Sequence, residues 1–173
     1  PVSDWPTGRY LLLMLLGVFT GCAGYTLGPI PPTYMKGVQS VAVPIIKNTT
    51  ITPDIEALAT TTIIRQIQQD GTYAVTGVDR ADAVVRGTIT SVSRTKARSL
   101  RGNVLASAEF NLLVTIDFRI ENPTTSQLLG ERAFTGNTSF FVGNDILSQE
   151  RQALPLAVQD AAVQFVSYLS EGW

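Results

Sequence analysis

The residue types on which most enzymes and metal sites depend are scarce in this sequence. The 173 residues include no histidine and a single cysteine, Cys22. The lack of histidine excludes Ser-His-Asp and Cys-His catalysis, histidine-ligated zinc and histidine-based pH switching. One cysteine forms neither an intrachain disulfide nor a cysteine-based metal cluster. No nucleophile or glycine-rich phosphate loop accompanies the carboxylates that acid–base chemistry would need, so we expect no enzyme, cofactor or metal site; these carboxylates are Asp79, Asp82, Asp117 and Glu121.

The context of Cys22 points to lipid attachment. It closely follows the apolar run Tyr10–Phe19, which begins just after Arg9. As a helix this run rises only about 15 Å, half of a ~30 Å hydrocarbon core, so it is too short to span a membrane. A charged start, a short apolar stretch and a small residue before the cut are typical of a secretory signal, and Phe19-Thr20-Gly21-Cys22 resembles a bacterial lipobox with Phe19 in place of the usual Leu. We therefore expect cleavage before Cys22 and acylation of this residue; the alternative is a buried first helix with an ordinary free cysteine.

The expected cleavage divides the chain into three parts. Residues 1–21 are the lipoprotein signal peptide, residues 22–37 the lipidated N-terminus with a tether rich in proline and glycine, and residues 38–173 a single domain. The length of that domain is sufficient for one hydrophobic core. Ala23 stands where an aspartate would retain a lipoprotein in the inner membrane, so we expect a protein anchored to the outer membrane on its periplasmic side.

The first half of the domain predicts a strand, a helix and a short return strand. Val38–Ile46 alternates and then becomes wholly apolar, with Pro44 marking a bulge or an edge. Thr52 is a suitable helix N-cap, and the helix should continue to about Gln69 with an apolar stripe toward the core. Residues 72–78 then predict a short strand.

Three long strands follow, over residues 83–97, 107–121 and 127–142. The second has the clearest pattern, because its apolar residues stand two apart: Ala108, Phe110, Leu112, Val114, Ile116, Phe118 and Ile120. One face of this strand should therefore meet a core and the other water or a polar partner. In the first strand the same alternation predicts a core face of Ala83, Val85, Gly87 and Ile89 and an outer face of Arg86, Thr88, Thr90, Arg94 and Lys96. Phe140 and Phe141 are expected to be core or strand-end anchors.

A final helix is predicted from Asn144-Asp145 to about Ser170. Pro155 either kinks this helix or marks its true beginning. The resulting order, β-α-β-β-β-α with the short return strand after the first helix, predicts an α+β fold. Two helices should pack on one face of a mostly antiparallel, mixed four-stranded sheet.

Several short motifs follow one another in a specific order along the mature chain. They are Cys22-Ala23-Gly24-Tyr25, Val41-Ala42-Val43-Pro44 with Asn48-Thr49-Thr50, Ala81-Asp82-Ala83-Val84-Val85 with Gly87-Thr88-Ile89, Glu150-Arg151-Gln152-Ala153-Leu154-Pro155 and Glu171-Gly172-Trp173. In this order and spacing they resemble the lipopolysaccharide-assembly lipoprotein family LptE. The resemblance implies an outer-membrane lipoprotein that sits inside the β-barrel protein LptD and helps lipopolysaccharide reach the outer leaflet. It also implies a helix pair on a four-stranded sheet, and no catalytic residues.

A basic cluster provides the candidate binding residues. Six of the thirteen basic residues lie between Arg80 and Arg101, against one acid, Asp82. Arg94, Lys96 and Arg98 stand two apart and should share one face near a hairpin tip. With Arg101 they are candidate contacts for lipopolysaccharide phosphates or for the barrel partner, because guanidinium groups bind phosphate oxygens bidentately. The alternative is a solvated hairpin end whose charges prevent edge-to-edge pairing.

The charge balance and the motifs leave two functions open. A net charge of −1 argues against a general nucleic-acid binder, so the expected partners are an LptD-like barrel, lipopolysaccharide and, through the anchor, the membrane. The alternative is another periplasmic lipoprotein, of the secretion-pore or cell-wall-synthase-activator type, because such proteins also begin with a strand like Val41–Pro44 followed by Asn and Thr. A co-purifying barrel would favour the first function, and a ring of identical subunits the second.

Overall fold

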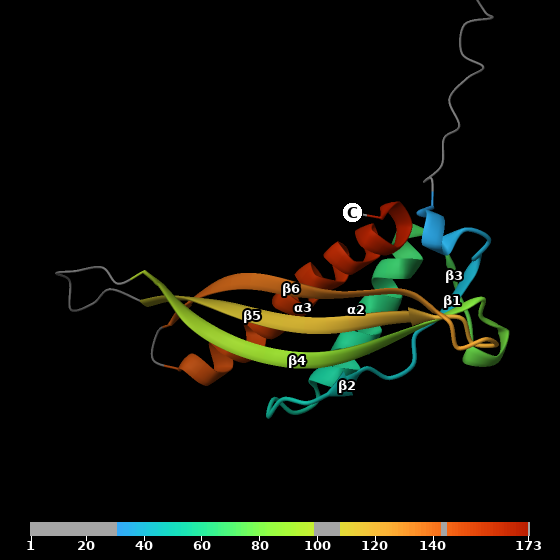
Figure 1. Cartoon of the computed structure of the whole chain (residues 1–173). Helices are drawn as coiled ribbons and strands as arrows, with labels where there is room; N and C mark the ends of the chain where they lie inside the picture. The colour runs from blue at the N-terminus through green and yellow to red at the C-terminus, as the bar shows by residue number, and fades with distance from the viewer. Residues whose placement is uncertain (1–30, 99–107, 143–144, 173) are drawn as a thin grey trace, which may run out of the picture.

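The computed structural model describes residues 31–98, 108–142 and 145–172. Helices α2 (Ile55–Asp70) and α3 (Ile146–Glu171) cover one face of a single mixed sheet (Figure 1). The predicted α+β fold is therefore confirmed, although within these ranges the sheet has six strands where the sequence predicts four. No helix within the described ranges is long and apolar enough to cross a membrane. The predicted lipid-attachment residue Cys22 and the basic residue Arg101 lie outside these ranges.

Three long antiparallel strands form most of the sheet. They are β4 (Ala83–Arg98), β5 (Ala108–Glu121) and β6 (Leu128–Val142). Alternate residues of β5 from Leu112 to Ile120 are at most 1% exposed, as the sequence pattern predicts. Among them, Phe118 stacks on Phe165 of α3 with 3.9 Å between ring centroids. The core therefore lies between the three strands and the helices.

The N-terminal edge of the sheet is built from short parallel strands. β1 (Ser40–Ala42) pairs with β3 (Ala74–Val75) and β4, and β2 (Lys47–Asn48) pairs with β4 further along. The predicted strand Val38–Ile46 is thus interrupted. Pro44 lies in the interruption, and it has no N–H to donate to a ladder. The predicted return strand is likewise only two residues long and is followed by the 3-10 turn η3 (Val78–Arg80).

The predicted N-cap of α2 at Thr52 is wrong. The helix begins at Ile55, and Asp54 before it has a left-handed φ of 61° and makes no side-chain cap bond. The side chain of Asn48 explains the delay, because it donates to the Thr52 carbonyl oxygen at 2.7 Å and accepts from the Thr50 N–H at 2.9 Å. These bonds hold the segment before Pro53 in a turn, so helical hydrogen bonding starts later.

Helix α3 is continuous through Pro155, which therefore does not mark its beginning. Asp145 caps the helix by accepting from the N–H groups of Leu147 and Ser148 at 3.1 and 3.2 Å. The helix backbone approaches β6 closely at Gly136, where a Cβ atom would lie 1.9 Å from the Ala157 carbonyl oxygen. This contact fixes the position of α3 across the sheet.

Candidate functional site

Two basic residues of β4, Arg94 and Lys96, do not lie on the face that their spacing predicts. A register shift between Ile89 and Ser91 leaves Thr90 unpaired in the ladder with β5. Before the shift, Ile89 pairs with Ile116. After it, Arg94 pairs with Leu112 and Lys96 with Phe110, and both partners lie on the same face of β5 as Ile116. Directly paired residues share a face of the sheet. Arg94 and Lys96 therefore lie on the side of the helices, and the prediction that they share the outer face with Arg86 is wrong.

A second register shift separates Arg98 from this pair. This shift falls between Lys96 and Arg98. Lys96 pairs with Phe110, and Arg98 pairs with the adjacent residue of β5, Glu109. A β-bulge of this kind interrupts the two-residue alternation of a strand. Of the four predicted residues, the structure thus brings Arg94 and Lys96 together on one face and does not continue their row to Arg98.

Arg94 is engaged by two elements. Its guanidinium group forms an ion pair with the carboxylate of Glu150 in α3, and it lies 5.6 Å from the centre of the Phe110 ring. Phe110 in turn stacks on Phe140 of β6 with 6.0 Å between centroids. Sequence reasoning missed Glu150 because it placed Arg94 on the opposite face. Arg94 therefore ties the hairpin to the first turns of α3, and Lys96 is the exposed cation beside it.

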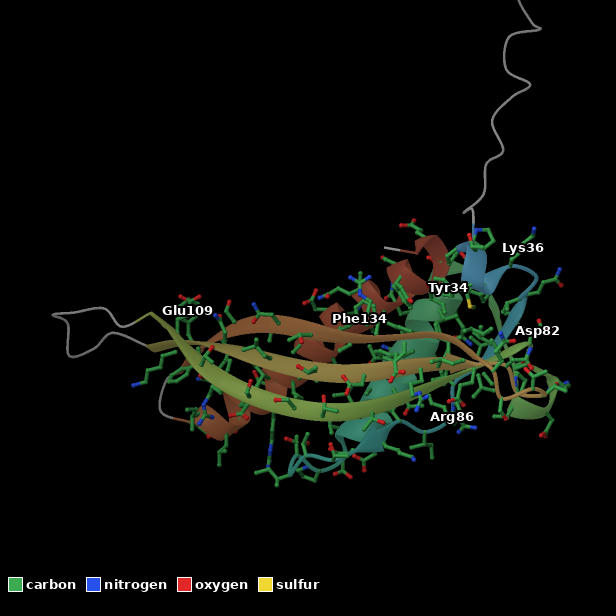
Figure 2. The ribbon with its side chains drawn as sticks, viewed as in Figure 1. Tyr34, Lys36, Asp82, Arg86, Glu109 and Phe134 are labelled. Atoms are coloured by element: carbon green, nitrogen blue, oxygen red, sulfur yellow. The ribbon has the colours of Figure 1, made fainter. Side chains whose placement is uncertain are left out.

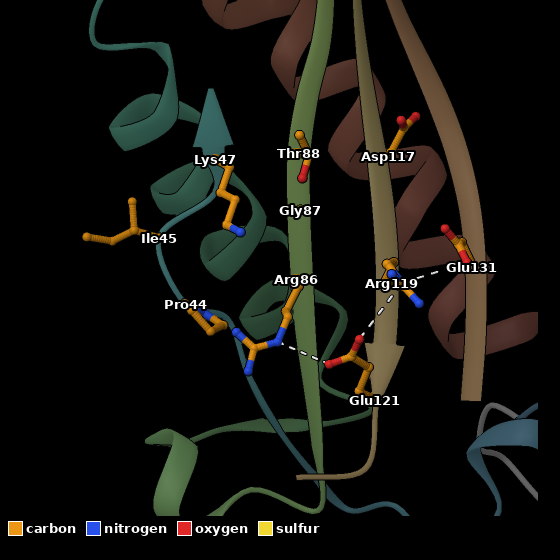
Figure 3. Close-up of a pocket in the computed structure, with 10 residues that line it drawn as sticks. All are labelled: Pro44, Ile45, Lys47, Arg86, Gly87, Thr88, Asp117, Arg119, Glu121 and Glu131. Carbon is orange, nitrogen blue, oxygen red and sulfur yellow. Dashed lines mark hydrogen bonds and ion pairs between the residues drawn. The ribbon is translucent and has the colours of Figure 1, made fainter. Parts of the chain in front are cut away.

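The outer face of the sheet carries a separate, charge-balanced groove of about 360 Å³ (Figure 3). Its centre is Glu121, whose two carboxylate oxygens lie 3.1 Å from Arg86 Nε and 3.8 Å from Arg119 Nε. Arg119 Nε is also 3.7 Å from the Glu131 carboxylate. Lys47 and Asp117 complete the charged lining, and Pro44 and Ile45 form an uncharged rim where the first strand is interrupted. This surface suits a polar partner.

Two of the four carboxylates considered for acid–base chemistry, Asp82 and Glu121, have structural contacts. Asp82 accepts hydrogen bonds from the N–H groups of Gln39 and Ser40 and from the Ser40 hydroxyl, at 3.1, 2.9 and 2.7 Å. The Ser40 hydroxyl bond and these backbone bonds hold the pKa of Asp82 below its usual range. Asp82 thus fastens the start of β1, while Glu121 belongs to the ion pairs above. Within the described residues, no cluster of three or more acidic, cysteine or histidine side chains could hold a metal ion.

Two tyrosines fasten the N-terminal half of the chain to the end of α3. The Tyr34 hydroxyl, in the turn η2 (Thr33–Met35), donates to the Tyr168 carbonyl oxygen at 2.6 Å, and the two rings stack at 5.3 Å. The Tyr73 hydroxyl donates to the next carbonyl oxygen, that of Leu169, at 3.0 Å. Burial raises the pKa of Tyr34 above its usual range and raises that of Tyr73 to about 12. The last residues of the predicted tether therefore pack on the domain.

The fold is shared with several bacterial proteins of low sequence identity. The chain is similar to a PelC dodecamer from Paraburkholderia phytofirmans, with 18% identity over 77% of this chain and 88% of that one and a TM-score of 0.52. It is also similar to XCC0632 from Xanthomonas campestris, with 10% identity, coverages of 76% and 83% and a TM-score of 0.57. A minor lipoprotein from Acinetobacter baumannii shows 16% identity, coverages of 76% and 92% and a TM-score of 0.51. These likenesses define the class of fold.

The sequence itself defines the family within this class. The model of the lipopolysaccharide-assembly family LptE matches residues 38–169, so the chain belongs to that family. A search of the curated proteins finds no match. The resemblance inferred from the short motifs is thereby confirmed.

Proposed function

We propose that this protein is an outer-membrane lipoprotein that serves as plug and partner of an LptD-like β-barrel and binds lipopolysaccharide. The observation that carries the proposal is the family match over residues 38–169, which spans the whole sheet, α2 and all but the last two residues of α3. The charged groove on the outer face supports it, because the interior of an outer-membrane barrel is polar. No cofactor or catalytic step is part of this function.

Purification from native membranes tests the partnership. The full chain, carried with its own leader, should co-purify with a protein of outer-membrane barrel size. A variant with Arg86→Ser and Arg119→Ser removes the cations that pair with Glu121 and should lose barrel, while a control with Arg65→Ser and Arg80→Ser should retain it. A ring of identical subunits without a barrel would instead support the secretion-pore or cell-wall alternative.

The anchor is the second part of the proposal. Cys22 is the last residue of the lipobox-like sequence, so Cys22→Ser should abolish incorporation of labelled palmitate and leave an uncleaved or soluble species. Palmitate entering the Cys22→Ser variant would contradict lipid attachment at this residue.

Lipopolysaccharide phosphates are the proposed ligands of Arg94, Lys96, Arg98 and Arg101. Lys96 supports this assignment best, since it is exposed and no ion pair to it occurs among the described residues, whereas Arg94 already pairs with Glu150. Replacing all four by Ser should weaken lipopolysaccharide binding, most strongly at low salt, because exposed charges are screened over about 8 Å at physiological ionic strength. Binding across a salt series, with a Lys36, Arg65 and Arg80 to Ser control, measures this. Equal affinity of the quadruple variant and wild type at low salt would contradict phosphate binding and support the alternative, a solvated hairpin end whose charges prevent edge-to-edge pairing.

A further inference from the structure

A groove with no charged residue in its lining lies between the end of β6 and the N-terminal half of α3. It holds about 340 Å³ and is lined by Ser139, Phe140, Phe141, Gln149, Gln152, Ala153 and Leu156. Phe140 and Ala153 are only 8% and 4% exposed and contribute to its floor. The outer-face groove, by contrast, is lined by six ionisable residues. The groove on α3 is therefore uncharged, and its Phe140, Phe141 and Leu156 side chains can contact an apolar ligand.

The rim of this groove carries apolar side chains that point into solvent. Phe141 is 64% exposed and Leu156 is 60% exposed. Single exposed apolar residues are common, but two that line the same groove indicate a surface that contacts something apolar.

The basic pair of β4 borders the same end. Glu150, which binds Arg94, directly follows the groove residue Gln149 in α3. Phe140 in the groove lining pairs with Phe110 of β5, and Phe110 pairs with Lys96 of β4, so the three residues share a face of the sheet. Figure 1 shows the first turns of α3 lying at the end of the molecule toward which β4 and β5 extend. An uncharged groove thus adjoins cationic side chains.

The neighbouring edge of β6 is not free to bind an extended peptide. The Asn137 N–H donates to Asp160 Oδ2 at 2.9 Å, and the Thr135 carbonyl oxygen accepts from Gln164 Nε2 at 3.2 Å. Both bonds come from side chains of α3 and occupy edge groups that an added strand would need. Strand addition along the middle of this edge is therefore blocked.

We propose that this groove binds one acyl chain of the lipid A part of lipopolysaccharide, with a lipid A phosphate near Lys96 and Arg94. The inference rests on the proposed function. It assigns a binding site to the acyl chains, which the basic residues cannot recognise. Charge complementarity is the argument for this ligand. The hydrocarbon chains of lipid A match the uncharged groove, and its phosphates match the neighbouring cations Arg94 and Lys96. Binding then removes Phe141 and Leu156 from water.

The test compares purified lipopolysaccharide with the same lipopolysaccharide stripped of its acyl chains. Phe141→Ser with Leu156→Gln should weaken binding of the acylated probe about tenfold or more, since burying one Leu or Phe side chain is worth at least about that factor. Binding of the deacylated probe should not change. The control variant Ile51→Gln with Val78→Ser removes apolar side chains that are 102% and 42% exposed elsewhere, and should match wild type with both probes. Thermal unfolding of all three proteins confirms that they are folded.

The outcomes separate this inference from the proposed function. Equal wild-type affinity for both probes would overturn the acyl-chain groove and leave lipopolysaccharide binding intact, whereas binding of neither probe would contradict the proposed function itself. An equal loss with both probes in a folded variant would also overturn the groove assignment. The same loss on phosphatidylglycerol vesicles would show a general membrane contact instead, and a wild-type dimer that the substitutions dissociate would show a contact between copies.

Discussion

At the scale of single residues, Gly136 is the position least able to carry a side chain. A Cβ atom there would lie 1.9 Å from the Ala157 carbonyl oxygen and 2.5 Å from the Ala161 nitrogen, so the α3 backbone would have to move. We expect Gly136→Ala to lower the free energy of unfolding by about 3 kcal/mol, at the upper end of overpacking effects. Urea denaturation measures this. Gly77→Ala is the control, because no atom lies within 4 Å of its added Cβ; equal stabilities of the two variants would contradict the close approach of α3.

Phe118 and Phe110 have the same place in the alternation of β5 but different surroundings. Phe118 is 1% exposed and stacks on Phe165, whereas Phe110 is half-buried near the hairpin end. Phe118→Ala should therefore destabilise the protein by about 3–5 kcal/mol, and Phe110→Ala by clearly less. Denaturant unfolding of both variants checks the difference. A larger loss at Phe110 would place the centre of the core nearer to the hairpin end.

At the scale of elements, Asp145 links the stability of α3 to pH. The Ser148 hydroxyl bond is the main reason that the pKa of Asp145 lies below its usual range. The unfolded chain, with a pKa of about 3.9 for this group, binds the proton first as pH falls. The stabilisation is thus complete at neutral pH and disappears as pH falls through about 4 and below.

Asp145→Asn should accordingly reduce stability at pH 7 and make little difference at pH 2–3. The measurement is the free energy of unfolding of both proteins across this range, relative to Asp54→Asn. Asp54 is a suitable control, because it precedes α2 without making a side-chain cap bond. A difference between wild type and Asp145→Asn that does not change with pH would contradict the role of the ionised cap.

Strands and helices with regular apolar spacing were predictable, and local interruptions were not. The pattern of β5 and the apolar stripe of α2 are fixed by burial on one face, which repeats along each element. Thr90 can bulge because it and Ser91 are both tolerated on either face, so alternation alone does not reveal the shift. One signal was available: Ile89 and Val92 stand three apart, a spacing that requires a change of phase if both face the core. The Asn48 turn, which moves the start of α2 from Thr52 to Ile55, depends on side-chain hydrogen bonds that the spacing of residue types does not reveal.

The candidate site was likewise predictable in its composition and not in its local geometry. The basic composition of the segment was visible in the sequence, but the face of Arg94 depended on the bulge, and its partner Glu150 on the packing of α3. The groove beside Leu156 was not predictable, since it forms between two elements distant in the chain.

At the scale of the whole molecule, Tyr34 and Tyr73 make stability sensitive to high pH. Their pKa values in the folded protein are raised, that of Tyr73 to about 12, while an unfolded tyrosine titrates near 10. Below about pH 10 both states keep the phenol proton, and above it the unfolded state loses the proton first, so stability falls as pH rises. Tyr34→Phe with Tyr73→Phe should be less stable at pH 8 and fall less steeply between pH 10 and 11.5. Unfolding curves at these pH values test this, and parallel losses in both proteins would contradict it.

The tyrosine contacts also determine how the domain would carry a mechanical load. Tyr34 and Lys36 lie at one end of the molecule, and Glu109 marks the other (Figure 2). A pull on the chain before Pro32 would first meet η2, where Met35 is fully buried and Tyr34 is bonded to the last turns of α3. Tension would therefore be shared between two segments 134 residues apart in sequence before β1 could peel from the sheet. The contacts of η2 with α3 would therefore have to break before β1 separates from its parallel neighbours β3 and β4.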